Sequence, residues 1–140
     1  MLSIILAMFA ILISLFWTLG LYSLLGFSYN VLTSMLIPLV VVLAIADDVH
    51  IMQRWGEARR RGNDEQAFKE TVSHLATPLF GASVTTALGM LSLATSSVVA
   101  VRSFGIGSAI GIMVDFVISL VLVPTLLTLV RSNAVVPPHE

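Results

Sequence analysis

Long uninterrupted runs of apolar residues dominate the pattern along this chain and predict membrane-spanning helices. A helix needs about 20 mostly apolar residues to cross roughly 30 Å of hydrocarbon. Four segments meet this requirement, at about residues 2–26, 31–53, 75–97 and 104–130. The first is too long for the core of a signal peptide, and no basic region precedes it. We therefore expect an all-α membrane protein with four transmembrane helices.

Polar residues concentrate in the links between these segments. Residues 27–30 predict a tight polar turn, residues 54–74 a longer cytoplasmic loop, and residues 132–140 a disordered tail. Within the loop, Asn63 is followed at the third position by Gln66, which is the spacing of a capping box. The loop is therefore expected to contain an amphipathic surface helix leading into the third span. Residues 1–131 are expected to form one membrane domain.

Composition supports this interpretation and excludes other classes of protein. Hydrophobic residues make up 57% of the 140 residues and charged residues only 11%, whereas about 25% is usual for soluble domains. A soluble enzyme and a disordered segment are therefore excluded. The net charge of −1 provides no field for binding nucleic acid. The absence of cysteine excludes disulfides and thiolate chemistry.

The basic residues predict the orientation of the chain in the membrane. With four spans, both termini and the 54–74 loop lie on one side. That side has six basic residues and the other has only Arg102; the six are Arg54, Arg59, Arg60, Arg61, Lys69 and Arg131. The positive-inside rule places both termini in the cytoplasm. Four aromatic residues are candidates for interfacial anchors: Trp17, Tyr22, Tyr29 and Trp55.

Three acidic residues lie where hydrocarbon should exclude them. Asp47 and Asp48 are in the second span, roughly 10 Å inside the boundary marked by Arg54. Asp115 is near the middle of the fourth span. An acid at the centre of a membrane helix costs about 2.5–3.5 kcal/mol on insertion scales. Such residues usually face the interior of the bundle, form pairs or carry protons.

The third span provides polar partners for the acid pair. Ser83, Thr85 and Thr86 are uncharged hydroxyl residues near mid-membrane, and we expect them to lie close to Asp47 and Asp48. Low-dielectric surroundings disfavour the charged form of a carboxylate, so a buried pair can load and release a proton. The alternative is a polar cluster that only holds the helices together. Two adjacent acids suit that role poorly, because ionising both is costly.

Other polar and small residues have two interpretations each. His50 shares a helix face with Asp47 and is either part of the relay or an interfacial residue. Asp115 is either functional or satisfied within its helix by Ser119, four residues further on. Four glycines are expected to allow close helix packing: Gly89, Gly105, Gly107 and Gly111.

Cofactor chemistry is not expected. A metal site built on Asp47, Asp48 and His50 would need further ligands, and His74 and His139 are expected to lie elsewhere. The chain also has no phosphate-binding loop for ATP. Protons are therefore the expected coupling ion.

The order of several motifs resembles the resistance–nodulation–division superfamily, and its predicted hydrophobe exporters of the MMPL type in particular. The branch is related to sterol-sensing and Patched-like proteins. The resemblance covers about residues 1–131 and rests on segments 26–30, 45–51, 83–89, 102–105 and 123–127, which read GFSYN, IADDVHI, SVTTALG, RSFG and VPTLL. It implies that the chain corresponds to helices three to six of one transporter half. The family's relay acids match Asp47 and Asp48, with Asp47 aligning better.

The resemblance implies proton-driven export of a hydrophobic or amphiphilic small molecule or lipid, with this chain supplying the relay helices. The protein is then a secondary transporter and not an enzyme. We expect the protein to lie in a bacterial inner membrane with membrane lipids as partners. We also expect it to associate with the rest of the transporter. The first two helices, the extracytoplasmic domain and the second half of such transporters have no counterpart here. Oligomeric state is left open. Two alternatives remain, a lipid-sensing module that does not transport and a protein-export accessory subunit.

Overall fold

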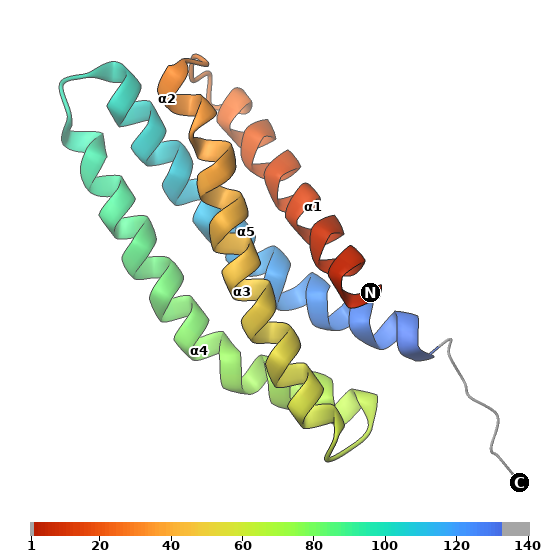
Figure 1. Ribbon diagram of the computed structural model, residues 1–140. Helices are drawn as coiled ribbons and strands as arrows, with labels where there is room; N and C mark the ends of the chain where they lie inside the picture. Colours follow the sequence, from red (N-terminus) through yellow and green to blue (C-terminus); the bar gives the residue numbers. More distant parts are fainter. Residues whose placement is uncertain (1, 133–140) are drawn as a thin grey trace, which may run out of the picture.

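The computed structural model describes residues 2–132, and among them it contains helices and no strand (Figure 1). The helices are α1 (Leu2–Leu24), α2 (Val31–Ser34), α3 (Leu36–Arg59), α4 (Asp64–Leu91) and α5 (Val99–Ser132), with a short 3₁₀ helix, η1, at Ser92–Thr95. Four candidate spans are long and apolar enough to cross a membrane, at Ile5–Leu24, Val31–Arg59, Glu65–Thr95 and Val99–Leu129. The predicted fold class, an all-helical chain with four helices able to span a membrane, is confirmed.

Helix α5 is the central element of the bundle. It packs against α1, α3 and α4, whereas α1 and α4 make no comparable contact with each other within the described residues. The α1–α2 link and the link before α5 lie at one end, and the α3–α4 turn lies at the other (Figure 1). Residues brought to α5 from three other helices can therefore meet at one place.

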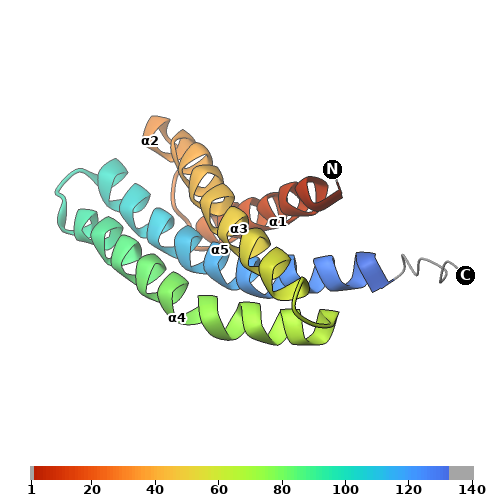
Figure 2. The ribbon, with the colours of Figure 1, turned by 60° about the horizontal axis from the view of Figure 1, so that its bottom comes forward.

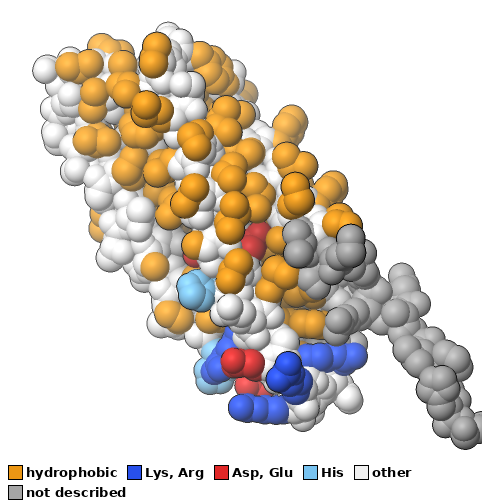
Figure 3. Space-filling model, in the orientation of Figure 1, with side chains coloured by type: hydrophobic (Ala, Val, Ile, Leu, Met, Phe, Trp, Pro, Cys, Tyr) orange, Lys and Arg blue, Asp and Glu red, His pale blue; other side chains and the backbone are white. Residues whose placement is uncertain are grey.

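Much of the outer surface is apolar, as a bundle in lipid requires. Large hydrophobic side chains remain exposed on the helices, among them Phe16, Leu24 and Val31, each of which is about four-fifths exposed, at 78%, 83% and 82%. Charged side chains gather at the end that carries the α3–α4 turn (Figure 3). Lipid tails can cover the apolar surface, so the helices need not turn every apolar side chain inward.

The turn at residues 25–35 is fixed by local chemistry. Gly26 has a φ of 72°, a left-handed conformation that glycine adopts without steric cost after a helix ends. Asn30 then caps α2, because its Oδ1 accepts from the Thr33 backbone N–H at 3.0 Å. Thr33 Oγ1 accepts in return from the Asn30 backbone N–H at 3.3 Å. This reciprocal pair is a capping box.

Two prolines lie near changes in helix geometry. Pro38 has no N–H to bond the carbonyl of Ser34, and the chain passes from α2 to α3 at Met35. Pro78 lies inside α4, which bends near its middle (Figure 2).

The segment predicted as a cytoplasmic loop is mostly helical. Helix α3 continues to Arg59 and α4 begins at Asp64. The expected capping residues are in place, since the Asn63 backbone N–H donates to Gln66 Oε1 at 3.4 Å. The surface helix is the first part of α4 and continues directly into the third span. The tail at 133–140 lies outside the described residues, and so does the side chain of Arg131.

Two of the predicted aromatic anchors are core residues. Tyr22 and Trp55 are buried, at 1% and 4% exposure, whereas Trp17 and Tyr29 are exposed. The Tyr22 hydroxyl lies 3.1 Å from Thr33 Oγ1, and its ring packs beside Phe27 and Tyr29. Burial of aromatic rings inside the bundle therefore overrides the tendency of tyrosine and tryptophan to sit at the membrane surface.

Candidate functional site

The centre of the bundle contains two buried carboxylates on facing helices. Asp48 of α3 is 1% exposed and Asp115 of α5 is 2% exposed. Asp47 is half-buried and lies near enough to interact electrostatically with both. The three acids predicted from the sequence therefore form one cluster, although Asp115 comes from a segment far from the other two in the chain.

The cluster is poorly supplied with hydrogen bonds. The Ser119 hydroxyl lies beside Asp48, and the Ser14 hydroxyl lies beside Asp115. Within the described residues, however, no donor forms a hydrogen bond of good geometry with either carboxylate oxygen of Asp48 or with Asp115 Oδ1. The alternative in which Ser119 satisfies Asp115 within α5 is not seen, because the Ser119 hydroxyl lies beside Asp48. Buried acceptors left in this state are costly and usually mark a functional site or a place for water.

A small cavity joins Asp47 and Asp115 to the third span. It has a volume of about 50 Å³ and is lined by Leu43, Asp47, Ala82, Ser83, Thr86, Ile112 and Asp115. A single water needs only about 10–15 Å³ of such volume and at least two polar partners. The cavity is therefore large and polar enough for water to bridge the carboxylates and the hydroxyls.

The three expected partners on α4 do not all reach this cavity. Ser83 and Thr86 line it, and Thr86 Oγ1 also donates to the carbonyl of Ala82 at 2.8 Å. Thr85 does not line it; its hydroxyl bonds the carbonyls of its own helix at Gly81 and Ala82, both at 2.9 Å. Helical rotation separates Thr85 from Thr86, so only one threonine of the pair can face the acids.

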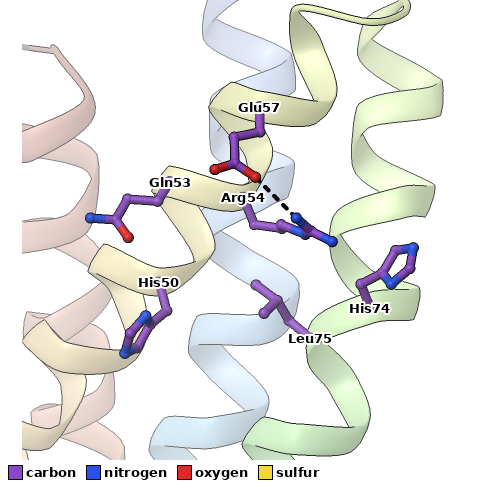
Figure 4. A pocket seen from close by; sticks show the side chains of 6 residues that line it. All are labelled: His50, Gln53, Arg54, Glu57, His74 and Leu75. Carbon is purple, nitrogen blue, oxygen red and sulfur yellow. Dashed lines mark hydrogen bonds and ion pairs between the residues drawn. The ribbon is translucent and has the colours of Figure 1, made fainter.

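His50 lies apart from the buried cluster, toward the end of the bundle that carries the α3–α4 turn. It is exposed and interacts electrostatically with Asp47. It lines a pocket of about 350 Å³ with Gln53, Arg54, Glu57, His74 and Leu75 (Figure 4). The expectation that His74 lies elsewhere is wrong, because the antiparallel return of α4 brings it beside the end of α3. Even so, no group of three or more histidine, aspartate or glutamate side chains that could hold a metal ion occurs among the described residues.

The glycines differ in the space around them. A Cβ built on Gly107 would lie 2.5 Å from the Tyr22 ring, and one on Gly111 would lie 2.7 Å from Thr18 Cγ2. A Cβ on Gly105 would meet Leu93 and the carbonyl of Met90, both at 2.6 Å. Nothing lies within 4 Å of a Cβ built on Gly89. Close packing is thus seen at three of the expected positions and not at Gly89.

Sequence reasoning missed the contribution of the first helix. Ser14 is fully buried beside Asp115, and Thr18 is buried one turn away, at 1% exposure. Hydroxyl residues four apart in an otherwise apolar span were the available signal. Their direction toward α5 could not be read from the span alone, since its outer face is equally apolar.

An apolar cavity lies between α1 and α3. Its volume is about 580 Å³, and it is lined by Ala7, Met8, Ile11, Leu12, Leu15, Val41, Ile45, Asp48, Val49 and Met52. Its size falls within the range of small-molecule sites, about 300–1,000 Å³. Asp48 is its one acidic lining residue, so the cavity adjoins the buried acid cluster.

Comparison with known proteins identifies the family. A family model described as the sterol-sensing domain of SREBP cleavage-activation matches residues 1–133. The chain belongs to the sterol-sensing domain family. This sterol-sensing domain is also 30% identical, over 129 residues, to a membrane protein of Methanocaldococcus jannaschii. The match covers 91% of the chain but 33% of that relative, so the chain spans about a third of the relative's length. No solved structure matches.

The match agrees with the part of the predicted resemblance that concerns sterol-sensing proteins. A sterol-sensing domain is a membrane module and not a catalytic family, and the family indicates a membrane function related to lipids or sterols. The wider assignment to resistance–nodulation–division transporters of the MMPL type stays a prediction.

Proposed function

We propose that this sterol-sensing domain supplies the proton-relay helices of a transporter that exports a hydrophobic or amphiphilic molecule across the cell membrane. The observation that carries the proposal is the pairing of Asp48 and Asp115, both buried and both with unbonded carboxylate oxygens. Acids in such a position are seldom kept for stability, because each costs free energy in the membrane.

The arrangement suggests a route for the proton. His50 is exposed toward the end that carries the α3–α4 turn, and it interacts with Asp47. Asp47 and Asp115 border the small cavity with Ser83 and Thr86, and Asp48 interacts with both acids. A proton entering at His50 would pass to Asp47 and then, through water in the cavity, to Asp115 and Asp48. Each transfer changes the charge next to α5, the helix that contacts the other three spans.

Neutral substitutions test the relay. The protein is reconstituted in liposomes loaded with pyranine, and proton entry is followed after a pH gradient is imposed. We expect Asp48→Asn and Asp115→Asn each to slow proton entry by about tenfold or more, because a carboxamide cannot exchange a proton in this way. The matched control is Glu65→Gln, which removes an exposed acid paired with Lys69 at 2.7 Å.

Two results would contradict the proposal. One is a wild-type rate no higher than that of empty liposomes. The other is an unchanged rate in the double variant Asp47→Asn with Asp48→Asn, in protein that unfolds at the wild-type temperature.

The apolar cavity between α1 and α3 favours a second candidate function, lipid sensing without transport. In this case the cavity would take a sterol or an acyl chain, and the acids would be dispensable. Binding of the fluorescent sterol dehydroergosterol distinguishes the two. Sensing predicts that Leu12→Trp, which fills the cavity, abolishes binding, while Asp115→Asn leaves binding intact and wild-type protein moves no protons.

A further inference from the structure

The pocket between the ends of α3 and α4 has an unusual set of side chains for the surface of a membrane bundle. Four lining residues come from α3 (His50, Gln53, Arg54 and Glu57) and two from α4 (His74 and Leu75). The Arg54 side chain extends from α3 toward α4, and Leu75 extends from α4 toward α3 (Figure 4). We call this the α3–α4 pocket. The acid cluster lies deeper in the bundle, and of the relay residues only His50 lines the pocket.

Most donors in the pocket have no acceptor within the described part of the chain. Arg54 Nη1 donates to Glu57 Oε2 at 3.0 Å, and this contact uses one of the five N–H groups of the guanidinium. The remaining donors of Arg54, the rings of His50 and His74, and the Gln53 amide make no hydrogen bond among the described residues. Glu57 holds the guanidinium in place, so Arg54 is oriented while most of its donors stay available.

The position of the pocket suits an amphiphile. Charged side chains cover the end of the bundle next to it, and the surface beyond is apolar (Figure 3). Arg59, Arg60 and Arg61 follow on the same side and favour negative charge near this surface. A lipid bound here would place its headgroup at the pocket and its acyl chains along the apolar surface. Basic pockets between membrane helices on the cytoplasmic side are typical sites for anionic headgroups.

We propose that the α3–α4 pocket binds the phosphate group of an anionic membrane lipid. The planar guanidinium of Arg54 matches phosphate oxygens in a two-point contact, which an ammonium group cannot reproduce. His74 lines the pocket from α4, and His50 and Gln53 line it from α3. Lipid headgroups and soluble phosphate esters both carry a phosphate group. The apolar surface beside the pocket favours a lipid over a soluble ester, because acyl chains can lie along it.

Native mass spectrometry of the purified protein tests the site. The protein is mixed in detergent with dioleoylphosphatidylglycerol or, separately, with dioleoylphosphatidylcholine. We expect the wild type to retain phosphatidylglycerol preferentially. Arg54→Lys keeps the charge but loses the planar fork, and His74→Asn replaces the imidazole, which can carry a positive charge, with a shorter and uncharged amide. Each is expected to lower retention of phosphatidylglycerol roughly fivefold or more, as loss of a charge-assisted hydrogen bond does.

Two matched controls use the same substitution outside the pocket. Arg102→Lys changes the single basic residue at the other end of the bundle, and Arg60→Lys changes the nearby basic cluster. Both should retain the lipid as the wild type does. Equal retention in Arg54→Lys, His74→Asn and Arg102→Lys would overturn the proposal. An equal loss in Arg60→Lys would overturn it too, because retention would then depend on a guanidinium that lies outside the pocket.

A competition arm identifies the source of the phosphate. Glycerol 1-phosphate carries the phosphate group without acyl chains. If the headgroup of a lipid is the natural occupant, glycerol 1-phosphate at the same concentration leaves phosphatidylglycerol bound. If glycerol 1-phosphate at equal concentration displaces phosphatidylglycerol, and Arg54→Lys weakens this displacement, the pocket binds phosphate but its occupant is not a lipid. That result would overturn the assignment to a lipid. All variants are first shown to unfold at the wild-type temperature in detergent.

Discussion

Gly107 and Gly89 show at the residue scale that the same residue type has different roles within one bundle. Gly107 lies on α5 against the ring of Tyr22, where a Cβ would overlap at 2.5 Å and would also meet Leu36 at 3.0 Å. Gly89 lies on α4 with open space around it. The missing Cβ at Gly107 lets α5 approach α1 and α3, so the close contact depends on that glycine.

This difference predicts opposite effects of one substitution. Gly107→Ala should lower the free energy of unfolding by about 1–3 kcal/mol, because the added methyl group overpacks the helix contact. Gly89→Ala should be neutral or stabilising by up to about 1 kcal/mol, because alanine favours helix over glycine. Equilibrium unfolding in mixed detergent micelles measures the change in the free energy of unfolding for both variants. Equal effects of the two substitutions would contradict the packing assigned to Gly107.

At the scale of elements, the junction of α1 and α2 holds one end of the bundle together. The Tyr22 hydroxyl is 3.1 Å from Thr33 Oγ1 and 3.5 Å from the Ser28 carbonyl oxygen. The Asn30 capping box fixes Thr33 within α2. Tyr22, Leu36 and Val40 form one buried apolar cluster, with Leu15, Leu19, Phe27 and Phe104 packed against it. The position of α3 relative to α1 therefore depends on this junction.

Removing the hydroxyl of Tyr22 should weaken the junction without emptying the core. Tyr22→Phe is expected to lower the free energy of unfolding by about 0.5–1.5 kcal/mol, the usual net value of a hydrogen bond. The control is Tyr29→Phe, since the Tyr29 hydroxyl bonds the Leu19 carbonyl at an exposed position. Its loss should cost less, because water can replace it. Thermal unfolding in detergent compares the two, and a larger loss for Tyr29→Phe would refute this account.

At the scale of the whole molecule, the charge distribution predicts how the bundle lies in the membrane. The α3–α4 turn and the link before α5 lie at opposite ends (Figure 1), and basic residues gather at the first of these ends. The positive-inside rule places that end, and with it both termini, in the cytoplasm. This orientation remains a prediction.

The absence of cysteine allows a direct test of orientation. Single cysteines are introduced at Arg61, in the α3–α4 turn, and at Ser97, in the link before α5; both positions are exposed. A maleimide that cannot cross the membrane should label Ser97→Cys in intact cells and Arg61→Cys only after the membrane is opened. The reverse pattern would show that the bundle lies the other way round.

The spans, the caps and the acids of this protein were determined by its sequence. Four runs of apolar residues are long enough to cross a membrane, and the backbone in lipid must then be helical because water is absent there to bond it. Asn63 and Gln66 marked the start of α4 because capping depends on neighbours in the chain. The sequence alone marked three acids as candidates, Asp47, Asp48 and Asp115. An acidic side chain in hydrocarbon costs free energy whichever face of the helix carries it.

The partners of those acids were decided only by the tertiary structure. Ser14 meets Asp115, Ser119 turns to Asp48, and Thr86 lines the cavity while Thr85 does not. His74 reaches the pocket of His50 because α4 runs back along α3. In a span that is apolar on every side, hydropathy carries no information about which face turns inward. The rotation of each helix is set by steric fit at residues such as Gly107 and Gly111, which depends on the neighbouring helices.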